Sequence, residues 1–297
     1  MPKLHVVIYY NVLCQRAKRY AQAYERFFNH QQYKVATLAS TASRHQDIEQ
    51  LRQHCKHATE CVVIGGDGSM NIAANVLAHT ATALSAIPMG TGNDFAYSQG
   101  LTHWRWRMRN EVIQQTQAIG RVQPANSHMK EQYFVNHVGC GLSVDLMALQ
   151  PRWLKQSVGK LSYSIALLRY LFGRESLRSR IRHASHWDDG QIVALGRCIG
   201  GGITVYPQAT RQHTQLAWIG IPKMPRWCQL KALFNVWRGH VDRVSELEYA
   251  IGQQFSLGDA EHRIELDGDI YFHGPATVSA VANALVVTLP VVAAQKS

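Results

Sequence analysis

Residues Cys61–His79 have the sequence CVVIGGDGSMNIAANVLAH. A short apolar strand, Cys61–Ile64, leads into the glycine loop Gly65–Ser69, and a helix is predicted to follow. Glycines let backbone N–H groups approach anionic oxygens closely, and a helix N-terminus adds unpaired donors and a positive dipole end. The stretch therefore predicts a phosphate cradle. On this loop alone, a plain strand-to-helix turn capped by Asp67 and Ser69 explains the pattern equally well.

A second loop of the same kind shifts the balance toward a binding site. The apolar strand Ala83–Pro88 runs into MGTGNDFA, residues 89–96. Both loops follow strands, so they are expected side by side at the carboxyl edge of one parallel sheet, where α/β proteins bind ligands. The Walker pattern, the GxGxxG fingerprint and the HExxH and GxSxG motifs are absent from the sequence.

Asp67 is the unexpected residue in the first loop. A carboxylate repels phosphate unless a divalent cation lies between them, so its presence indicates Mg²⁺ chemistry.

The first 120 residues alternate apolar strand-like runs with helical patterns, which predicts a parallel sheet covered by helices. The expected elements are Leu4–Tyr10, Gln15–His30, Tyr33–Leu38, Arg44–Cys55, Cys61–Ile64, Met70–His79 and Ala83–Pro88. From about Gln132 the pattern changes to short β-rich segments at Tyr133–His137, Gln191–Cys198, Ile203–Tyr206, Gln215–Ile221 and Arg263–Phe272. We therefore expect an α/β domain over residues 1–125 and a β-rich domain over 126–297. The polar stretch Arg121–Lys130 marks the boundary, and the last strand can return to the N-terminal domain.

Composition places the chain among ordinary globular proteins and excludes disorder: of 297 residues, 46% are hydrophobic and 17% charged. A net charge of +11 favours an anionic partner, either a nucleotide, a nucleic acid or a membrane surface. No segment supplies about 20 unbroken apolar residues, so no transmembrane helix is expected. The N-terminus MPKLHVVIYY predicts a buried strand and not a signal peptide, and six scattered cysteines favour a reduced, cytoplasmic protein.

Two basic segments favour peripheral contact with an anionic membrane. Residues 151–182, which include a predicted helix at Trp153–Phe172, carry eight basic side chains against one acid, Glu175. The run Trp104–Arg109 alternates aromatic and basic residues, as interfacial segments do. A solvated surface is the alternative for both, and nucleic acid is not expected as a partner.

The two glycine loops occur together with further motifs in one order along nearly the whole chain. These are GGDGS at Gly65–Ser69, PMGTGNDFA at Pro88–Ala96, YFVNHVGCG at Tyr133–Gly141, GKLSY at Gly159–Tyr163, GGG followed by YPQA at Gly200–Ala209, and ELDGD at Glu265–Asp269. In this combination the sequence resembles the diacylglycerol kinase catalytic-domain family, the soluble bacterial lipid kinases with their sphingosine and ceramide kinase relatives.

The resemblance implies an N-terminal α/β nucleotide-binding domain of the NAD-kinase and phosphofructokinase type and a C-terminal β-sandwich that takes the lipid. It implies ATP- and Mg²⁺-dependent phosphorylation of a lipid hydroxyl, such as that of diacylglycerol, in the cleft between them, and hence a place in phospholipid biosynthesis. Carried over to this sequence, Asp67 would orient the metal and Asp269 would accept the hydroxyl proton. The implied nucleotide-binding residues are Asn11, Ser40, Gly65, Gly66, Gly68, Ser69, Asn71, Gly90, Thr91, Asn93 and Asp94.

The sequence also departs from the family pattern. The early NPxSG loop is Asn11–Gln15, NVLCQ, and a family acid is replaced by Ile72. Asn126 and His213 stand where aspartates help to hold a structural Mg²⁺, so that second metal site is expected to be absent. Asp269 is one methylene shorter than the family glutamate.

These departures leave two alternatives to an active lipid kinase. One is a catalytically weak relative that binds nucleotide or lipid, and the other is a kinase of a soluble substrate, against which the GTGNDFA loop argues. The sequence does not name the lipid, and a homodimer is compatible with it.

Overall fold

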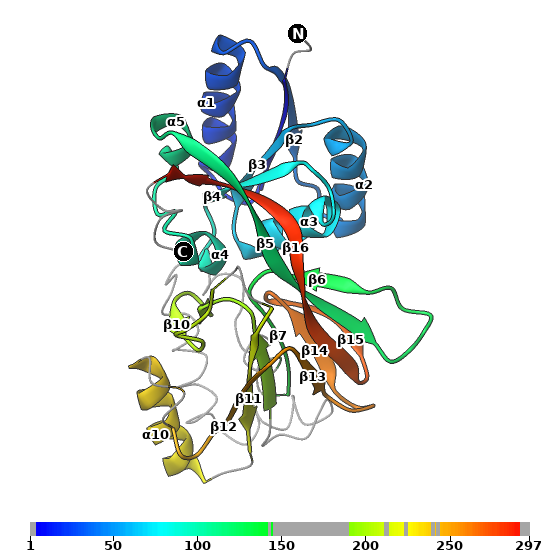
Figure 1. Ribbon diagram of the computed structural model, residues 1–297, viewed down its shortest axis with the longest axis vertical. Helices are drawn as coiled ribbons and strands as arrows, with labels where there is room; N and C mark the ends of the chain where they lie inside the picture. Colours follow the sequence, from blue (N-terminus) through cyan, green and yellow to red (C-terminus); the bar gives the residue numbers. More distant parts are fainter. Residues whose placement is uncertain are drawn as a thin grey trace. The chain divides into compact units, whose positions relative to one another are not determined.

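The computed structural model describes residues 4–141, 144, 190–210, 214–222, 225–238, 241 and 244–291. The chain forms two compact units, shown in Figure 1: unit 1 comprises Met1–Ile119 and Val281–Ser297, and unit 2 comprises Gly120–Ala280. Two long strands, β5 (Val112–Pro124) and β16 (Ala276–Pro290), contribute residues to both units. Arg121–Lys130, the expected boundary, forms the end of β5 and most of the connection to the next strand.

Strands and helices alternate along unit 1, which confirms the α/β class expected from the sequence. The elements are β1 (His5–Tyr10), α1 (Ala17–His30), β2 (Lys34–Ala39), α2 (Arg44–Cys55), β3 (Glu60–Gly65), α3 (Asp67–Leu77), β4 (Ala83–Pro88), α4 (Asp94–Ser98) and α5 (Trp106–Arg109). The sheet order is β2-β1-β3-β4, continued by β16 and β5, and the pairs from β2 to β16 are parallel.

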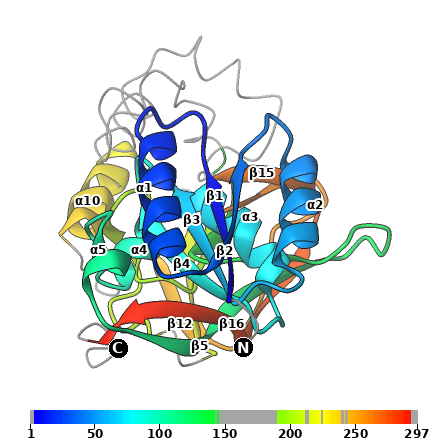
Figure 2. The same ribbon diagram turned by 90° about the horizontal axis from the view of Figure 1, so that it is seen from above.

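This strand order creates a topological switch point between β1 and β3. After β1 the chain passes through α1 to β2 on one side, whereas after β3 it passes through α3 to β4 on the other. Helix α1 therefore covers one face of the sheet, and α2 and α3 cover the other, as Figure 2 shows. Ligands of open α/β sheets bind outside the carboxyl ends of the strands at such a point.

Strands β3 and β4 form the centre of the unit 1 core. All residues of both strands are buried, as is typical of parallel strands that are covered on both faces. A rigid pair of strands therefore carries the two glycine loops.

Unit 2 is built from antiparallel strands and one described helix. The elements are β6 (Gln132–Phe134), β7 (His137–Gly141), β8 (Gly190–Ala194), β9 (Cys198–Ile199), β10 (Ile203–Thr204), β11 (Leu216–Ile221), α10 (Arg226–Trp237), β12 (Glu248–Gly252), β13 (Gln254–Leu257), β14 (Arg263–Leu266) and β15 (Asp269–His273). The main sheet has the order β12-β11-β8-β7-β14-β15 and is antiparallel throughout.

The core of unit 2 lies between two layers of strands. Val122 of β5, Phe134 of β6 and Val278 of β16 pack in one apolar cluster with Val193 of β8 and Ile264 of β14. The first three belong to the sheet that contains β5 and β16, and the last two to the six-stranded sheet. Two sheets that share an apolar cluster form a β-sandwich core, as the sequence suggested.

The single strand predicted at Tyr133–His137 is two strands in different sheets. The chain breaks at Val135 and Asn136, between β6 and β7. Sequence patterning could not locate the break, because the backbone groups there are bonded to Asp267, more than a hundred residues away.

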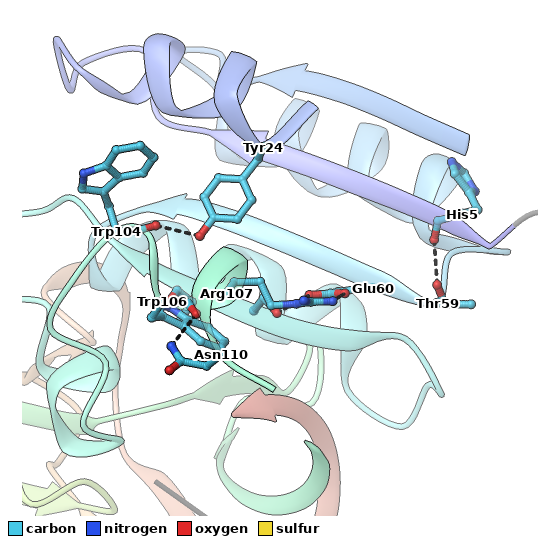
Figure 3. Close-up of polar contacts among 10 residues, drawn as sticks. His5, Tyr24, Thr59, Glu60, Trp104, Trp106, Arg107 and Asn110 are labelled. Atoms are coloured by element: carbon cyan, nitrogen blue, oxygen red, sulfur yellow. Dashed lines mark hydrogen bonds and ion pairs between the residues drawn. The ribbon is translucent and has the colours of Figure 1, made fainter. Parts of the chain in front are cut away.

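The run Trp104–Arg109 was expected to lie on a surface that contacts a membrane. The structure contradicts this for Trp106 and Arg107, whose side chains are anchored inside unit 1. The indole of Trp106 is 5% exposed and donates to the Ala86 carbonyl at 2.9 Å. Arg107 reaches the buried Glu60 through two N–H groups, at 2.7 and 2.8 Å (Figure 3). Trp104 stacks on Tyr20, and its carbonyl accepts from the Tyr24 hydroxyl.

Among the described residues, no helix is long and apolar enough to cross a bilayer. The basic segment 151–182 and its predicted helix lie outside the described residues.

The pair between Glu60 and Arg107 gives a test of the unit 1 core. Arg107→Met leaves a buried carboxylate without its cation, so we expect it to lower the free energy of unfolding by about 3–5 kcal/mol in urea denaturation. Arg109→Met, on an exposed side chain of the same helix, is the control and should change it by less than about 0.5 kcal/mol. Equal effects of the two changes would show that the buried pair is not needed for the core.

Candidate functional site

The segments that follow β1, β2 and β4 are joined by hydrogen bonds to one another or to the end of β3 at the switch point. The Asn11 amide after β1 donates to the Ile64 carbonyl of β3 at 3.0 Å, and the Met89 amide after β4 donates to the Gly65 carbonyl at 2.9 Å. The hydroxyl of Ser40, after β2, accepts from the Val12 amide at 3.1 Å. The carboxyl edge of the sheet is thus one connected structure.

The two glycine loops touch backbone to backbone. A Cβ added to Gly90 would lie 2.4 Å from the Cα of Gly66, and one added to Gly66 would lie 2.9 Å from the Cα of Gly90. No side chain fits at either distance without a shift of the main chain. Glycine is therefore required at both positions for the loops to approach each other this closely.

Asp67 fastens the first loop to the second. Its carboxylate accepts from the backbone amides of Asp94 at 3.1 Å and Phe95 at 3.0 Å, which are the first two residues of α4. A carboxylate at a helix N-terminus satisfies amides that have no partner within the helix and complements the positive end of the dipole. Asp67 therefore has a structural role between the two loops, whereas the sequence suggested a structural role only as a cap within its own turn.

The second loop is held in shape by Asn93. Its backbone is left-handed, with φ of 60°, and its side-chain amide exchanges two 2.7 Å hydrogen bonds with the backbone of Gly90. Asparagine tolerates this conformation better than most residues. The turn directs Thr91 outward, where it is exposed.

Helix α3 begins at Asp67 with Gly66 as its N-cap, at the switch point. The Ser69 amide already donates to the Gly66 carbonyl at 3.0 Å, so this terminus offers the Gly68 amide and the positive end of the helix dipole to an anion. Gly65 must be glycine because a Cβ there would lie 2.4 Å from the Ser69 hydroxyl oxygen. The local structure is therefore that of the cradle expected from the sequence.

The nucleotide-binding residues expected from the resemblance fall into two sets. Asn11, Ser40, Gly66, Gly68 and Thr91 are partly or fully exposed, whereas Gly65, Ser69, Asn71, Asn93 and Asp94 are buried. Gly90 is half-buried, and its amide is already bonded to Asn93. The buried set shapes the loops, and the exposed set is the part that a ligand could reach.

Arg44 is a residue of this site that the sequence analysis missed. At the first position of α2, its guanidinium donates to the buried side-chain oxygen of Asn71 in α3 at 2.6 Å. A cation at a helix N-terminus is electrostatically unfavourable for the helix. Its unfavourable position at the start of a helix was the one feature of the sequence that could have indicated a contact of Arg44 outside its own helix.

Unit 2 carries a second group of acids at the hairpin between β14 and β15. Asp267 is buried in the turn with φ of 47°, and its carboxylate accepts the amides of Val135, Asn136 and His137 at 2.7, 2.7 and 3.0 Å. Asp269, two residues further on, begins β15 and is exposed. Asp267 therefore fixes the turn, and Asp269 is presented by it.

Beside Asp267, the buried Glu265 completes the hairpin. Its carboxylate accepts the Gly268 amide at 3.1 Å and lies 3.2 Å from Nε2 of His137. The sequence analysis singled out Asp269 alone and missed the structural acids on either side of Leu266.

The described residues contain no group of three or more His, Cys, Asp or Glu side chains placed to hold a metal ion. A Mg²⁺ ion that arrives with a nucleotide needs only one or two protein carboxylates, because phosphates and water supply the other oxygens. Asp67 is a half-buried carboxylate in the first glycine loop, and a carboxylate oxygen can accept an amide and also coordinate a cation. Asp67 therefore fits such an ion.

Comparison with known proteins agrees with this geometry. Residues 5–125 match the family model described as the diacylglycerol kinase catalytic domain. The resemblance to this family is confirmed. A diacylglycerol kinase of Mycobacterium tuberculosis is 28% identical over 77% of this chain and 76% of its own length. A Cronobacter sakazakii protein named "Probable lipid kinase YegS-like" is 30% identical over 51% of this chain and 52% of its own length.

A solved structure extends the likeness to the whole fold. The crystal structure of a diacylglycerol kinase from Bacillus anthracis superposes with a TM-score of 0.63 and covers 97% of both chains, at 12% sequence identity. This identity is too low to carry more than the fold. The chain thus combines the fold of diacylglycerol kinases with a catalytic-domain match in its N-terminal part.

The bonds of Asp67 predict a stability effect in the absence of any ligand. In Asp67→Asn one acceptor oxygen becomes an N–H donor that faces an amide, so we expect a loss of about 1–3 kcal/mol in the free energy of unfolding. Glu49→Gln, at an exposed carboxylate of α2, is the control and should be neutral. Unchanged stability of Asp67→Asn without Mg²⁺ and nucleotide would show that the two bonds from Asp67 to the α4 amides contribute nothing to stability.

Asp267 and Asp269 form a matched pair for unit 2. Asp267→Asn replaces a buried carboxylate that accepts three amides, so we expect it to lower the free energy of unfolding by about 2–4 kcal/mol. Asp269→Asn changes an exposed side chain and should shift it by less than about 0.5 kcal/mol. The reverse order, measured by urea denaturation, would overturn the division of roles between the two acids.

Proposed function

We propose that this protein is an ATP-dependent lipid kinase, which transfers the γ-phosphate of ATP to a lipid hydroxyl such as that of diacylglycerol. The observation that carries the proposal is the pair of glycine loops that Gly66, Gly90 and Asp67 hold together at the switch point. The family match over residues 5–125 and the lipid kinases among the relatives support it.

In this proposal the ATP phosphates bind at the N-terminus of α3. First-turn amides, with Gly66 and Gly68 allowing close approach, would donate to phosphate oxygens, and the exposed Thr91 hydroxyl would add a donor from the second loop. Asp67 would hold Mg²⁺, which would supply neutralisation of the phosphate charge when bound. The bonds from Asp67 to the α4 amides would fix the positions of these donors before the nucleotide binds.

Asp269 would accept the proton of the attacking hydroxyl. The hydroxyl oxygen bonds to the γ-phosphorus, the bond to the bridging oxygen breaks, ADP leaves, and the hydroxyl proton passes to the Asp269 carboxylate. Asp267 supports this role because its bonds to three amides hold the turn that carries Asp269. A positioned base contributes a factor of about 10²–10⁴ to such reactions.

The substrate resides in a bilayer, so the protein would act in the cytoplasm as a peripheral enzyme on an anionic membrane surface. The net charge of +11 supports this partner.

The deciding experiment uses γ-labelled ATP, Mg²⁺ and a panel of lipids that includes diacylglycerol, followed by extraction into an organic phase. Label in the organic phase that depends on one added lipid identifies the substrate. Nucleotide binding without any transfer would favour the catalytically weak relative, and label on a soluble acceptor would refute a lipid substrate.

The role of Asp269 predicts a kinetic split. Asp269→Ala should lower kcat by at least about 10²-fold with little change in ATP affinity or stability, because a proton acceptor acts mainly in the transition state. Asp269→Glu should retain activity, and a rate above wild type would show that the shorter side chain is a handicap. Glu261→Ala, at another exposed acid of unit 2, is the control. A loss confined to ATP affinity would assign Asp269 to binding.

A further inference from the structure

Helix α10 presents large apolar side chains to solvent. The indole of Trp227 is 82% exposed and the ring of Phe234 is 51% exposed, whereas Ala232 on another face of the helix is 5% exposed. A surface helix normally turns its aromatic residues toward the core. In the described part of α10 the usual distribution is reversed.

The exposed residues form one stripe that also contains cations. Trp227, Lys231, Phe234 and Arg238 follow each other at spacings of four, three and four residues. At about 100° per residue these positions fall within an arc of about 60°. We call these four residues the α10 stripe. Arg238 directly follows α10, and the helix has no acidic residue in its sequence RWCQLKALFNVW.

The two cations of the stripe have different partners, since Arg238 lies against a ring and Lys231 is paired with an acid. The Arg238 guanidinium lies 4.4 Å from the centre of the Phe234 ring, and its backbone amide donates to the Phe234 carbonyl at 3.2 Å. The Lys231 ammonium contacts Glu246 at 2.6 Å. Aromatic rings flanked by cations are the combination found where a helix lies in the interface of an anionic bilayer.

The charges of the stripe favour an anionic bilayer over a second copy of the chain as its binding partner. A symmetric dimer through the stripe would bury two Arg238 guanidinium groups and two Lys231–Glu246 pairs, and the removal of these charges from water opposes association. An anionic lipid surface attracts the same cations and accepts the rings at headgroup depth. The net charge of +11 acts in the same direction.

We propose that the α10 stripe is a membrane-docking surface, which inserts Trp227 and Phe234 among anionic headgroups. The inference rests on the proposed function for the presence of a lipid substrate, but the docking step itself requires neither ATP nor catalysis.

The test is co-sedimentation of the full chain with vesicles, without nucleotide. Wild type should bind vesicles of phosphatidylglycerol mixed with phosphatidylcholine, bind pure phosphatidylcholine weakly, and be released by high salt, which shortens the Debye length from about 8 Å to about 3 Å at 1 M. The double variant Trp227→Ser, Phe234→Ser should bind at least about tenfold more weakly. The control Ile251→Ser, at an exposed apolar residue of β12, should bind as wild type does.

A second readout keeps the test informative if the double variant folds poorly. Trp227→Phe preserves an aromatic ring, so vesicle binding should persist while the blue shift of tryptophan fluorescence on binding decreases. The variant Lys231→Gln, Arg238→Gln should lose the preference for phosphatidylglycerol. Binding that is unchanged in the double variants, or a wild-type dimer that Trp227→Ser, Phe234→Ser converts to a monomer, would overturn the proposal.

Activity on lipid in detergent micelles separates this inference from the proposed function. If the protein phosphorylates lipid in micelles but the stripe variants bind vesicles as wild type does, only the docking surface is refuted. Stripe-dependent vesicle binding without transfer in micelles would refute only the kinase.

Discussion

The contact between the backbones of Gly66 and Gly90 sets the geometry of the proposed nucleotide site. Strands β3 and β4 are adjacent and parallel, so their loops leave the sheet at the same edge, and only the absence of two Cβ atoms lets them meet. Asp67 then fastens the first loop to the amides of α4. Without this contact, the N-terminus of α3 and the Thr91 turn would not be held at a fixed separation, and a phosphate chain would meet donors from one loop only.

In unit 2 a carboxylate also holds a turn by accepting backbone amides. Asp267 accepts three amides from the segment between β6 and β7, as Asp67 accepts two from α4. In both cases a carboxylate next to a glycine accepts main-chain amides. Each motif therefore contains an acid that is structurally occupied. For Asp67 the proposed metal role adds to this structural one, whereas in the hairpin the two roles fall on separate residues, Asp267 and Asp269.

The sequence predicted most of unit 1 because its signals are local. Apolar runs such as Ala83–Pro88 and the glycine loops that follow them depend on neighbouring residues, and the α/β class is confirmed. Prediction from the sequence failed where bonds between distant residues determine the local structure. The segment Tyr133–His137 is split by its bonds to Asp267, and Arg107 turns inward because it pairs with the buried Glu60. For Asp67 the sequence suggested a metal ligand or a cap within its own turn, since no pattern shows that its carboxylate meets the Asp94 and Phe95 amides. The assignment of individual residues to nucleotide contact remains a prediction.

The central claim is that closely packed glycine loops create the site for the nucleotide. Calorimetric titration of Mg²⁺·ATP into wild type and Gly90→Ala is the sharpest test, because the added Cβ would lie 2.4 Å from the Gly66 Cα, where the two loops meet. The account predicts measurable affinity for wild type and a loss of at least about tenfold in the variant, about 1.4 kcal/mol of binding free energy. Equal affinity in two folded proteins would contradict it.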